Sequence, residues 1–214
     1  MAEVGSTLLA AWIRGFARRI GDNASYLTDL DAAIGDADHG VNMDRGMKAV
    51  VAELDDGVPA DLGTVCKQAA TALIGSVGGA AGPLYGTLFL RMAAAFGPKA
   101  TVDSTTFATA LRSGVDGVKA RGRAETGDKT MVDALVPAVD ALDAALSAGA
   151  GLTEALHRAT DAAAAGRDAT APLVARKGRA SYLGERSAGH VDPGAASAAI
   201  LIAAAAAAAE GTVG

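Results

Sequence analysis

The chain has 214 residues, enough for one domain or at most two, and half of them are hydrophobic although only 4% are aromatic. Its formal net charge of −5 argues against non-specific binding to nucleic acid or to an anionic membrane surface, since both are negatively charged. The single cysteine, Cys66, excludes an intramolecular disulfide. The core must be built mainly from Ala, Leu, Val and Ile, and alanine favours helices.

The ends of the chain indicate neither a secretory signal nor a membrane span. A glutamate precedes the first apolar stretch and arginines follow it, the reverse of the order in a signal peptide. The longest apolar run, residues 195–209, is mostly alanine and shorter than the roughly 20 strongly apolar residues that a membrane span needs. We therefore expect a soluble, cytoplasmic protein without membrane contact.

Apolar residues recur at helical spacing along almost the whole chain, beginning with Leu8, Trp12 and Phe16. Further helices are predicted over about 22–34, 41–54, 61–76, 84–96, 104–121, 131–147, 152–171 and 194–210. No stretch shows sustained strand alternation, so no strand is expected. The pattern predicts one all-α domain over residues 1–214 with eight or nine helices, whose short links favour antiparallel neighbours.

Two connections are longer and more polar than ordinary turns, and such connections usually serve a function or are disordered. Residues 176–194 read RKGRASYLGERSAGHVDPG, which indicates a basic loop that docks on another surface. Residues 122–130 read GRAETGDKT and resemble a phosphate-binding P-loop. They contain one residue too many, Asp128, and no strand precedes them, so that interpretation is rejected. Lys129 and Arg123 are expected to act as local charges or at the start of a helix.

The acidic bend DAAIGDADHG, residues 31–40, carries Asp31, Asp36 and Asp38 close together. Asp31 would lie in the last turn of a helix, and Gly35 permits a sharp turn after it. Asp36 and Asp38 then point the same way from alternate positions. Three converging carboxylates repel one another unless hard cations lie between them, and oxygen ligands favour Mg²⁺ or Ca²⁺.

Other interpretations of the acidic bend are open. Solvated carboxylates, with Asp38 capping a helix, carry about equal weight when the bend is taken alone. An EF-hand is rejected because Val41 and Met47 stand where its glycine and bidentate glutamate belong.

The glycine-rich turn GSVGGAAGP, residues 75–83, lets backbone amides approach a phosphate at the start of a helix. Close helix packing is the favoured explanation when this turn is taken alone. Arg179 has the geometry to neutralise phosphate oxygens, unless it belongs to a solvated basic loop. His39 and His190 flank glycine-bearing turns, whereas His157 is expected to be structural. No Ser-His-Asp spacing and no zinc-type Cys/His cluster is recognisable.

Four stretches, taken together, resemble the L subunit of bacterial dihydroxyacetone kinase, the nucleotide-binding subunit of the kinase that is coupled to phosphoenolpyruvate. They are GDADHGVNM at 35–43, SVGGAAGPLYG at 76–86, GDKTM at 127–131 and ARKGRASYLGERSAGHVDPGA at 175–195. The resemblance covers nearly the whole chain in the same order, and the last stretch is highly specific.

This resemblance implies a barrel of eight antiparallel amphipathic helices with the nucleotide held at one end. It makes Asp31, Asp36 and Asp38 the ligands of two Mg²⁺ ions that bridge the diphosphate. The residues that it places around ADP or ATP are His39, Gly40, Val41, Asn42, Gly79, Ala80, Ala81, Gly122, Met131, Arg179, Asp192, Pro193 and Gly194. Relatives commonly carry a serine where this chain has Ala81, so one hydroxyl contact to phosphate is missing here.

The resemblance also implies partners. Dihydroxyacetone would be held on a separate K subunit, to which this chain donates the γ-phosphoryl group of ATP, and a phosphohistidine on an M subunit would recharge ADP in place. Phosphoryl transfer needs positioning and charge neutralisation, and no residue is assigned as a catalytic base. A homodimer is also possible.

Three other roles stay open at this point. The chain could serve a kinase for another small ketose or polyol, it could bind a regulator in a nucleotide-dependent way, or it could be a plain helical scaffold.

Overall fold

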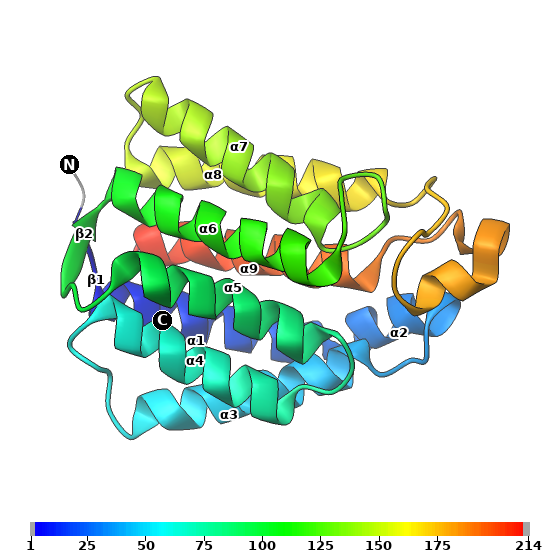
Figure 1. Cartoon of the computed structure of the whole chain (residues 1–214), viewed down its shortest axis with the longest axis horizontal. Helices are drawn as coiled ribbons and strands as arrows, with labels where there is room; N and C mark the ends of the chain where they lie inside the picture. Colours follow the sequence, from blue (N-terminus) through cyan, green and yellow to red (C-terminus); the bar gives the residue numbers. More distant parts are fainter. Residues whose placement is uncertain (1–2, 212–214) are drawn as a thin grey trace.

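The structure is a computed structural model that describes residues 3–211. Within that range the chain is helical almost throughout, which confirms the all-α prediction (Figure 1). The elements in chain order are β1 (Glu3–Gly5), α1 (Ser6–Asp22), α2 (Ala24–Ile34), α3 (His39–Asp55), α4 (Leu62–Ser76), α5 (Ala81–Phe96), β2 (Thr101–Asp103), α6 (Ser104–Gly122), α7 (Val132–Ser147), α8 (Leu152–Ala169), the 3₁₀ helix η1 (Arg179–Ser187) and α9 (Pro193–Ala209).

Most of the helices run side by side along the long axis of the molecule (Figure 1). From α3 to α9, each α-helix packs against the next one in the chain, and α1 packs against both α3 and α9. Helix α2 and η1 contact each other and lie together at one end (Figure 1). The connections before α3, α5, α7 and α9 also lie toward this end.

The core of the bundle is built around Trp12 of α1, which has no exposed surface. Its indole Nε1 donates to the Leu201 carbonyl of α9 at 2.8 Å. Its ring lies 6.0 Å from that of Phe89 in α5 and 5.7 Å from that of Phe107 in α6, centroid to centroid. Helix α9 is rich in alanine and buried on nearly all sides, and its small side chains allow α1, α7 and α8 to pack against it.

The expectation that the chain has no strand was wrong. Strands β1 and β2 form a short antiparallel pair in which Val4 faces Val102, at the end of the molecule away from α2 (Figure 1). Each strand has only three residues, too few for alternation to stand out in the sequence. The basic loop after α8 likewise contains a helical element, η1, which its polar sequence did not predict.

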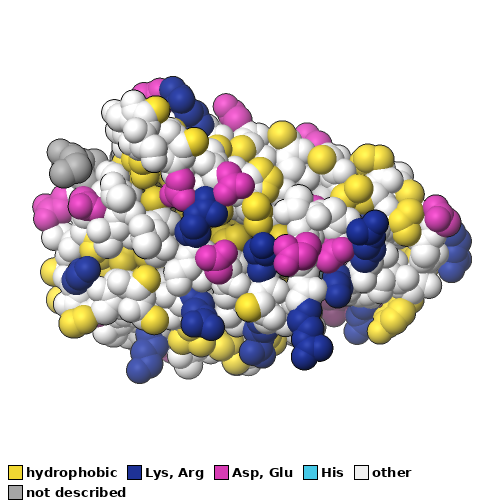
Figure 2. Space-filling view, turned by 45° about the horizontal axis from the view of Figure 1, so that its top comes forward, with side chains coloured by type: hydrophobic (Ala, Val, Ile, Leu, Met, Phe, Trp, Pro, Cys, Tyr) yellow, Lys and Arg dark blue, Asp and Glu magenta, His cyan; other side chains and the backbone are white. Residues whose placement is uncertain are grey.

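The molecular surface carries mixed charges. Acidic and basic side chains are interspersed on the face that Figure 2 shows. Charged side chains also join neighbouring helices: Arg112 of α6 pairs with Asp140 and Asp143 of α7 at 2.8 and 2.5 Å. Exposed pairs of this kind contribute little to stability, about 0–1 kcal/mol each. Among residues 3–211, no helix combines the length and the apolar character that crossing a membrane would require.

Candidate functional site

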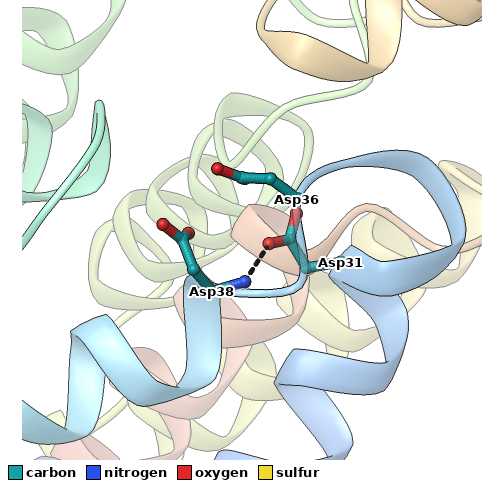
Figure 3. Close-up of side chains that lie close together, drawn as sticks. All are labelled: Asp31, Asp36 and Asp38. Atoms are coloured by element: carbon teal, nitrogen blue, oxygen red, sulfur yellow. Dashed lines mark hydrogen bonds between the residues drawn. The ribbon is translucent and has the colours of Figure 1, made fainter.

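The three carboxylates of the acidic bend converge where α2 ends and α3 begins. Asp31 lies in the last turn of α2, and Asp36 and Asp38 lie in the link to α3. One carboxylate oxygen of each residue lies within 4.8 Å of the others (Figure 3). Asp31 is only 8% exposed, so its charge is largely removed from water. The convergence that the sequence predicted is therefore present.

Hydrogen bonds to Asp31 hold the bend in shape. Its Oδ2 accepts from the backbone N–H of Asp38 at 2.8 Å, drawn in Figure 3, and from that of His39 at 3.1 Å. Asp38 occupies the N-cap position of α3, but its own side chain makes no capping hydrogen bond. The cap is supplied by Asp31 from the neighbouring helix, which leaves the Asp38 carboxylate available for a ligand.

The chemistry of this donor set fits a hard divalent cation. The site offers carboxylate oxygens alone, the ligands that Mg²⁺ and Ca²⁺ prefer. Among residues 3–211, one cation forms an ion pair with the cluster: Arg179 of η1 places Nη2 3.1 Å from Asp36 Oδ2. A single guanidinium offsets only part of three negative charges, so cation binding would relieve the remaining repulsion.

The acidic bend forms one wall of a cavity of about 380 Å³. The amino ends of four helices line the same cavity: His39 of α3, Ala81 of α5, Val132 of α7 and Pro193 of α9. The first N–H groups of a helix have no partner within it, and the helix dipole places about half a positive charge there. The cavity therefore combines carboxylates that suit cations with four helix ends that suit an anion.

The glycine-rich turn enters the cavity between α4 and α5. Gly79, Ala80 and Ala81 line it, and Gly79 has a φ of 66°, which favours glycine. A Cβ on Gly82 would lie 2.5 Å from the Val77 carbonyl oxygen, so close packing also requires glycine here. Close packing thus accounts for Gly82, whereas the approach of a phosphate to this turn stays a prediction.

His39 is held by a buried hydrogen-bond chain beside the acidic bend. Its Nε2 lies 2.9 Å from Ser197 Oγ, and Ser197 Oγ lies 2.7 Å from the hydroxyl of Tyr85. Burial lowers the pKa of His39, although the carboxylates of Asp31 and Asp38 oppose this shift. Ser197 and Tyr85 were not foreseen as neighbours of His39, because they come from α9 and α5, far away in the sequence.

The start of α9 brings Asp192, Pro193 and Gly194 to the cavity. Asp192 caps the helix by accepting from the Ala195 N–H at 2.7 Å, and Pro193 suits the first turn because it has no N–H to lose. Burial raises the pKa of Asp192 to about 7, and the neighbouring Lys129 opposes that shift. Asp192 is thus a structural cap at the cavity wall.

The structure brings most of the predicted nucleotide-contacting residues together and leaves two aside. Asn42, Gly122, Met131 and Arg179 line the cavity with those named above. Gly40 and Val41 are not among the lining residues. A Cβ on Gly40 would lie 1.9 Å from the Ala24 carbonyl oxygen, so this glycine serves packing of α3 against α2, and Val41 is 57% exposed. Contact of these two residues with a nucleotide stays a prediction.

The burial and hydrogen bonding of Lys129 were not predicted from the sequence. Lys129 was expected to be a local charge or to begin a helix, yet it is 1% exposed and its Nζ donates to backbone carbonyls of distant segments. A lone lysine in a polar turn gives no sequence signal of this, because its carbonyl partners are set by the tertiary fold.

Known proteins are similar to this chain over most of its length. A family model described as the DAK2 domain matches residues 33–207. The ADP-binding subunit DhaL of a PEP-dependent dihydroxyacetone kinase from Escherichia coli K12 is 43% identical over 91% of this chain and 93% of its own length. The ADP-binding subunit DhaL of a PTS-dependent dihydroxyacetone kinase from Lactococcus lactis is 37% identical over 88% and 90%, respectively.

A solved structure is similar in fold. The crystal structure of the dihydroxyacetone kinase from C. freundii in complex with AMP-PNP and Mg²⁺ matches with a TM-score of 0.73 and 27% sequence identity. The match covers 96% of this chain and 34% of that kinase, so the chain spans about a third of the crystallised protein.

Proposed function

Because the chain belongs to the DAK2 domain family, we propose that it is the ADP-binding subunit of a dihydroxyacetone kinase. In this role it would hold Mg-nucleotide and transfer the γ-phosphoryl group of ATP to dihydroxyacetone on a partner subunit. The observation that carries the proposal is the meeting of four helix amino ends with three carboxylates at one cavity. A polyphosphate chelated by magnesium is the ligand class that satisfies both kinds of group.

Different residues of the chain would bind the metal ions, the phosphates, and the base and ribose of the nucleotide. Asp31, Asp36 and Asp38 would hold two Mg²⁺ ions, which neutralise the charge that phosphoryl transfer has to manage. The backbone amides of the glycine-rich turn and of the α9 start would bind phosphate oxygens. Gly122 and Met131, across the cavity, would lie beside the base and ribose.

Arg179 would close the site. It reaches from η1 to Asp36, which supports a covering role for the basic loop. Its guanidinium would add positive charge beside bound phosphate and limit the access of water. Ala81 offers no hydroxyl, so the turn would depend on its amides.

The architecture supports a finer proposal about the fold. We propose that α1 and α3–α9 close into a barrel of eight antiparallel helices within a single domain of residues 1–214. The packing order supports this, because each of these helices contacts the next and α9 contacts α1. Helix α2 and η1 would then form the rim around the nucleotide.

The partner subunits are likewise part of the proposal. The relatives are named as subunits of PEP-dependent and PTS-dependent kinases, which supports a K subunit that carries dihydroxyacetone and an M subunit that recharges ADP through a phosphohistidine. A homodimer and a cytoplasmic location stay predictions from the sequence. Phosphoryl transfer assays with K subunits, using dihydroxyacetone and other small ketoses or polyols, would identify the acceptor.

The first test is calorimetry of ADP binding with and without Mg²⁺. We expect Mg²⁺-dependent binding to the unaltered chain and a loss of about tenfold or more in Asp36→Asn, because replacing even an outer-shell partner of a metal commonly costs about 10–100-fold. Asp29→Asn is the matched control, since Asp29 is exposed on α2 and outside the cavity. Unchanged ADP affinity in Asp36→Asn, with circular dichroism showing intact helices, would refute the metal assignment.

A further inference from the structure

Lys129 has a role in this structure that its position in a polar turn does not suggest. Its side chain is buried although lysine is seldom fully buried without partners. Its Nζ donates to four carbonyl oxygens, those of His190 at 2.5 Å, Thr170 at 2.8 Å, Leu173 at 3.1 Å and Ala171 at 3.3 Å. An ammonium has three protons, so these oxygens take up its entire donor capacity.

The four carbonyls belong to the two ends of the covering loop, which we define as residues 170–192. Thr170, Ala171 and Leu173 follow the end of α8, where helix carbonyls lack partners and the dipole is negative. His190 lies at the other end of the loop, just before the cap of α9. One ammonium therefore holds together two backbone segments that are about 20 residues apart in the chain.

Other contacts fasten the same junction. The Gly189 N–H donates to the Ala171 carbonyl at 2.7 Å, and the Asp192 N–H donates to Thr170 Oγ1 at 3.0 Å. These bonds join the loop ends to each other, whereas Lys129 also joins them to a third segment, the turn before α7. The junction is thus the base from which the loop projects over the cavity.

The turn that carries Lys129 is itself constrained. Lys129 has a φ of 63°, a left-handed conformation that is uncommon for a residue with a side chain. Asp133 of α7 fixes the turn by accepting from the Gly127 N–H at 2.5 Å and from the Thr130 N–H at 2.7 Å. An unusual backbone held in place on both sides of Lys129 indicates that the position of its side chain matters.

We propose that Lys129 is a positioning residue of the nucleotide site, whose ammonium fastens both ends of the covering loop to the turn before α7. This inference rests on the proposed function, because it assigns the residue a part in nucleotide binding. Lys129 would not contact the phosphates itself, since its protons are used by the four carbonyls. It would act through Arg179, which the loop carries, and through Gly194 at the start of α9.

The ammonium suits this role better than a guanidinium would. It is a compact charge with rotatable donors, whereas a guanidinium is planar and larger. Burial lowers the pKa of Lys129, and the nearby Asp192 opposes that shift. A neutral replacement would remove the ammonium donor from all four carbonyls. Those of Ala171 and Thr170 would keep the N–H groups of Gly189 and Leu173, whereas those of Leu173 and His190 would lose the donor that the structure gives them, which is costly in a buried position.

The test compares Lys129→Ala with Lys67→Ala, which removes an exposed lysine of α4. Hydrogen–deuterium exchange, followed peptide by peptide, would report the loop directly. We expect faster exchange in Lys129→Ala within residues 170–192, with α1 and α4 unchanged. Mg-ADP affinity should fall about tenfold or more, and added propylammonium should restore part of it. Lys67→Ala should match the unaltered chain in each measurement.

Two results would overturn the proposal: Mg-ADP affinity in Lys129→Ala equal to that of the unaltered chain, or faster exchange spread evenly over the bundle. If Lys129→Ala does not fold, Lys129→Met gives the same decision, since it keeps much of the side-chain volume and removes the ammonium donors. Local loosening with weaker binding would then support the proposal, and unaltered affinity would refute it. If the unaltered chain itself fails to bind Mg-ADP, the proposed function and the role of Lys129 in it both fall, while the exchange measurement still shows whether Lys129 anchors the loop.

Discussion

Gly35 determines where the Asp31 carboxylate can lie. A Cβ at this position would be 2.0 Å from Asp31 Oδ1 and 3.0 Å from the Asp31 carbonyl oxygen. The Asp31 side chain would have to rotate away, which would also disturb its bonds to the backbone of Asp38 and His39. The lack of a side chain at Gly35 therefore lets the Asp31 carboxylate take its place in the acidic bend.

Gly35→Ala should consequently weaken Mg²⁺-dependent ADP binding by about tenfold or more, as expected when a metal ligand is displaced. Gly151→Ala is the control, because Gly151 has a φ of −70° and open space around its Cα. Calorimetry of both variants would show whether the effect is specific. Equal affinities in the two variants would mean that the Asp31 geometry does not govern binding.

Within this site, the sequence predicted the position of some residues and not the partners of others. Asp31, Asp36 and Asp38 could be predicted to converge because a helix end, a glycine and an alternating pair are all local features. The hydrogen bond of His39 to Ser197 and the four carbonyls around Lys129 could not, because they depend on how distant helices pack. Local geometry is encoded in local sequence, whereas partners across the fold are not.

At the level of whole elements, α7 and α8 approach each other closely through one glycine. A Cβ on Gly166 of α8 would lie 2.2 Å from the Asp133 carbonyl oxygen of α7 and 3.1 Å from Pro137 Cγ. Pro137 lies within α7 and has no N–H to donate to the Asp133 carbonyl, the usual partner one turn earlier. The break in the hydrogen-bond ladder of α7 thus coincides with the closest approach of α8.

Gly166→Ala should therefore destabilise the protein by about 1–3 kcal/mol, although alanine in a helix is ordinarily favoured over glycine by about 1 kcal/mol. Gly75→Ala in α4 should show that ordinary gain, since a Cβ added to Gly75 would project into open space. Urea unfolding followed by circular dichroism would measure both. A stabilised Gly166→Ala variant would show that α8 can move away from α7 at no cost.

The helical periodicity located the α-helices to within a few residues, because amphipathic spacing survives even in an alanine-rich chain. It missed β1, β2 and η1 for a common reason. Each is short, and each depends on where it packs more than on its own pattern. Likewise, periodicity could give a number of helices but not the order in which they surround the core.

Across the whole molecule, the β1–β2 pair and the acidic bend lie at opposite ends (Figure 1). Val4 of β1 has no exposed surface and faces Val102, so it ties the start of the chain to the link between α5 and α6. Stability contributed at that end does not involve any residue that lines the cavity. Stability contributed by the β1–β2 pair and nucleotide binding at the acidic bend should therefore be separable.

Val4→Ala should lower the free energy of unfolding by about 1–3 kcal/mol and leave the Mg-ADP affinity of the folded protein unchanged. Val58→Ala, which alters a valine that is 42% exposed, should change neither quantity. Chemical denaturation and calorimetry would give the two values for each variant. A marked loss of affinity in Val4→Ala would show that the two ends are coupled through the bundle.

Trp12 is the only tryptophan in the chain. Its ring packs near those of Phe89 and Phe107, its indole N–H donates to the Leu201 carbonyl, and none of these four residues lines the cavity. Its fluorescence should thus report loss of the bundle and stay constant when nucleotide enters. Denaturation curves read from this one fluorophore at rising Mg-ADP concentrations would then shift only through preferential binding to the native state. Trp12 can therefore serve as an intrinsic fluorophore that reports unfolding of the bundle separately from nucleotide binding.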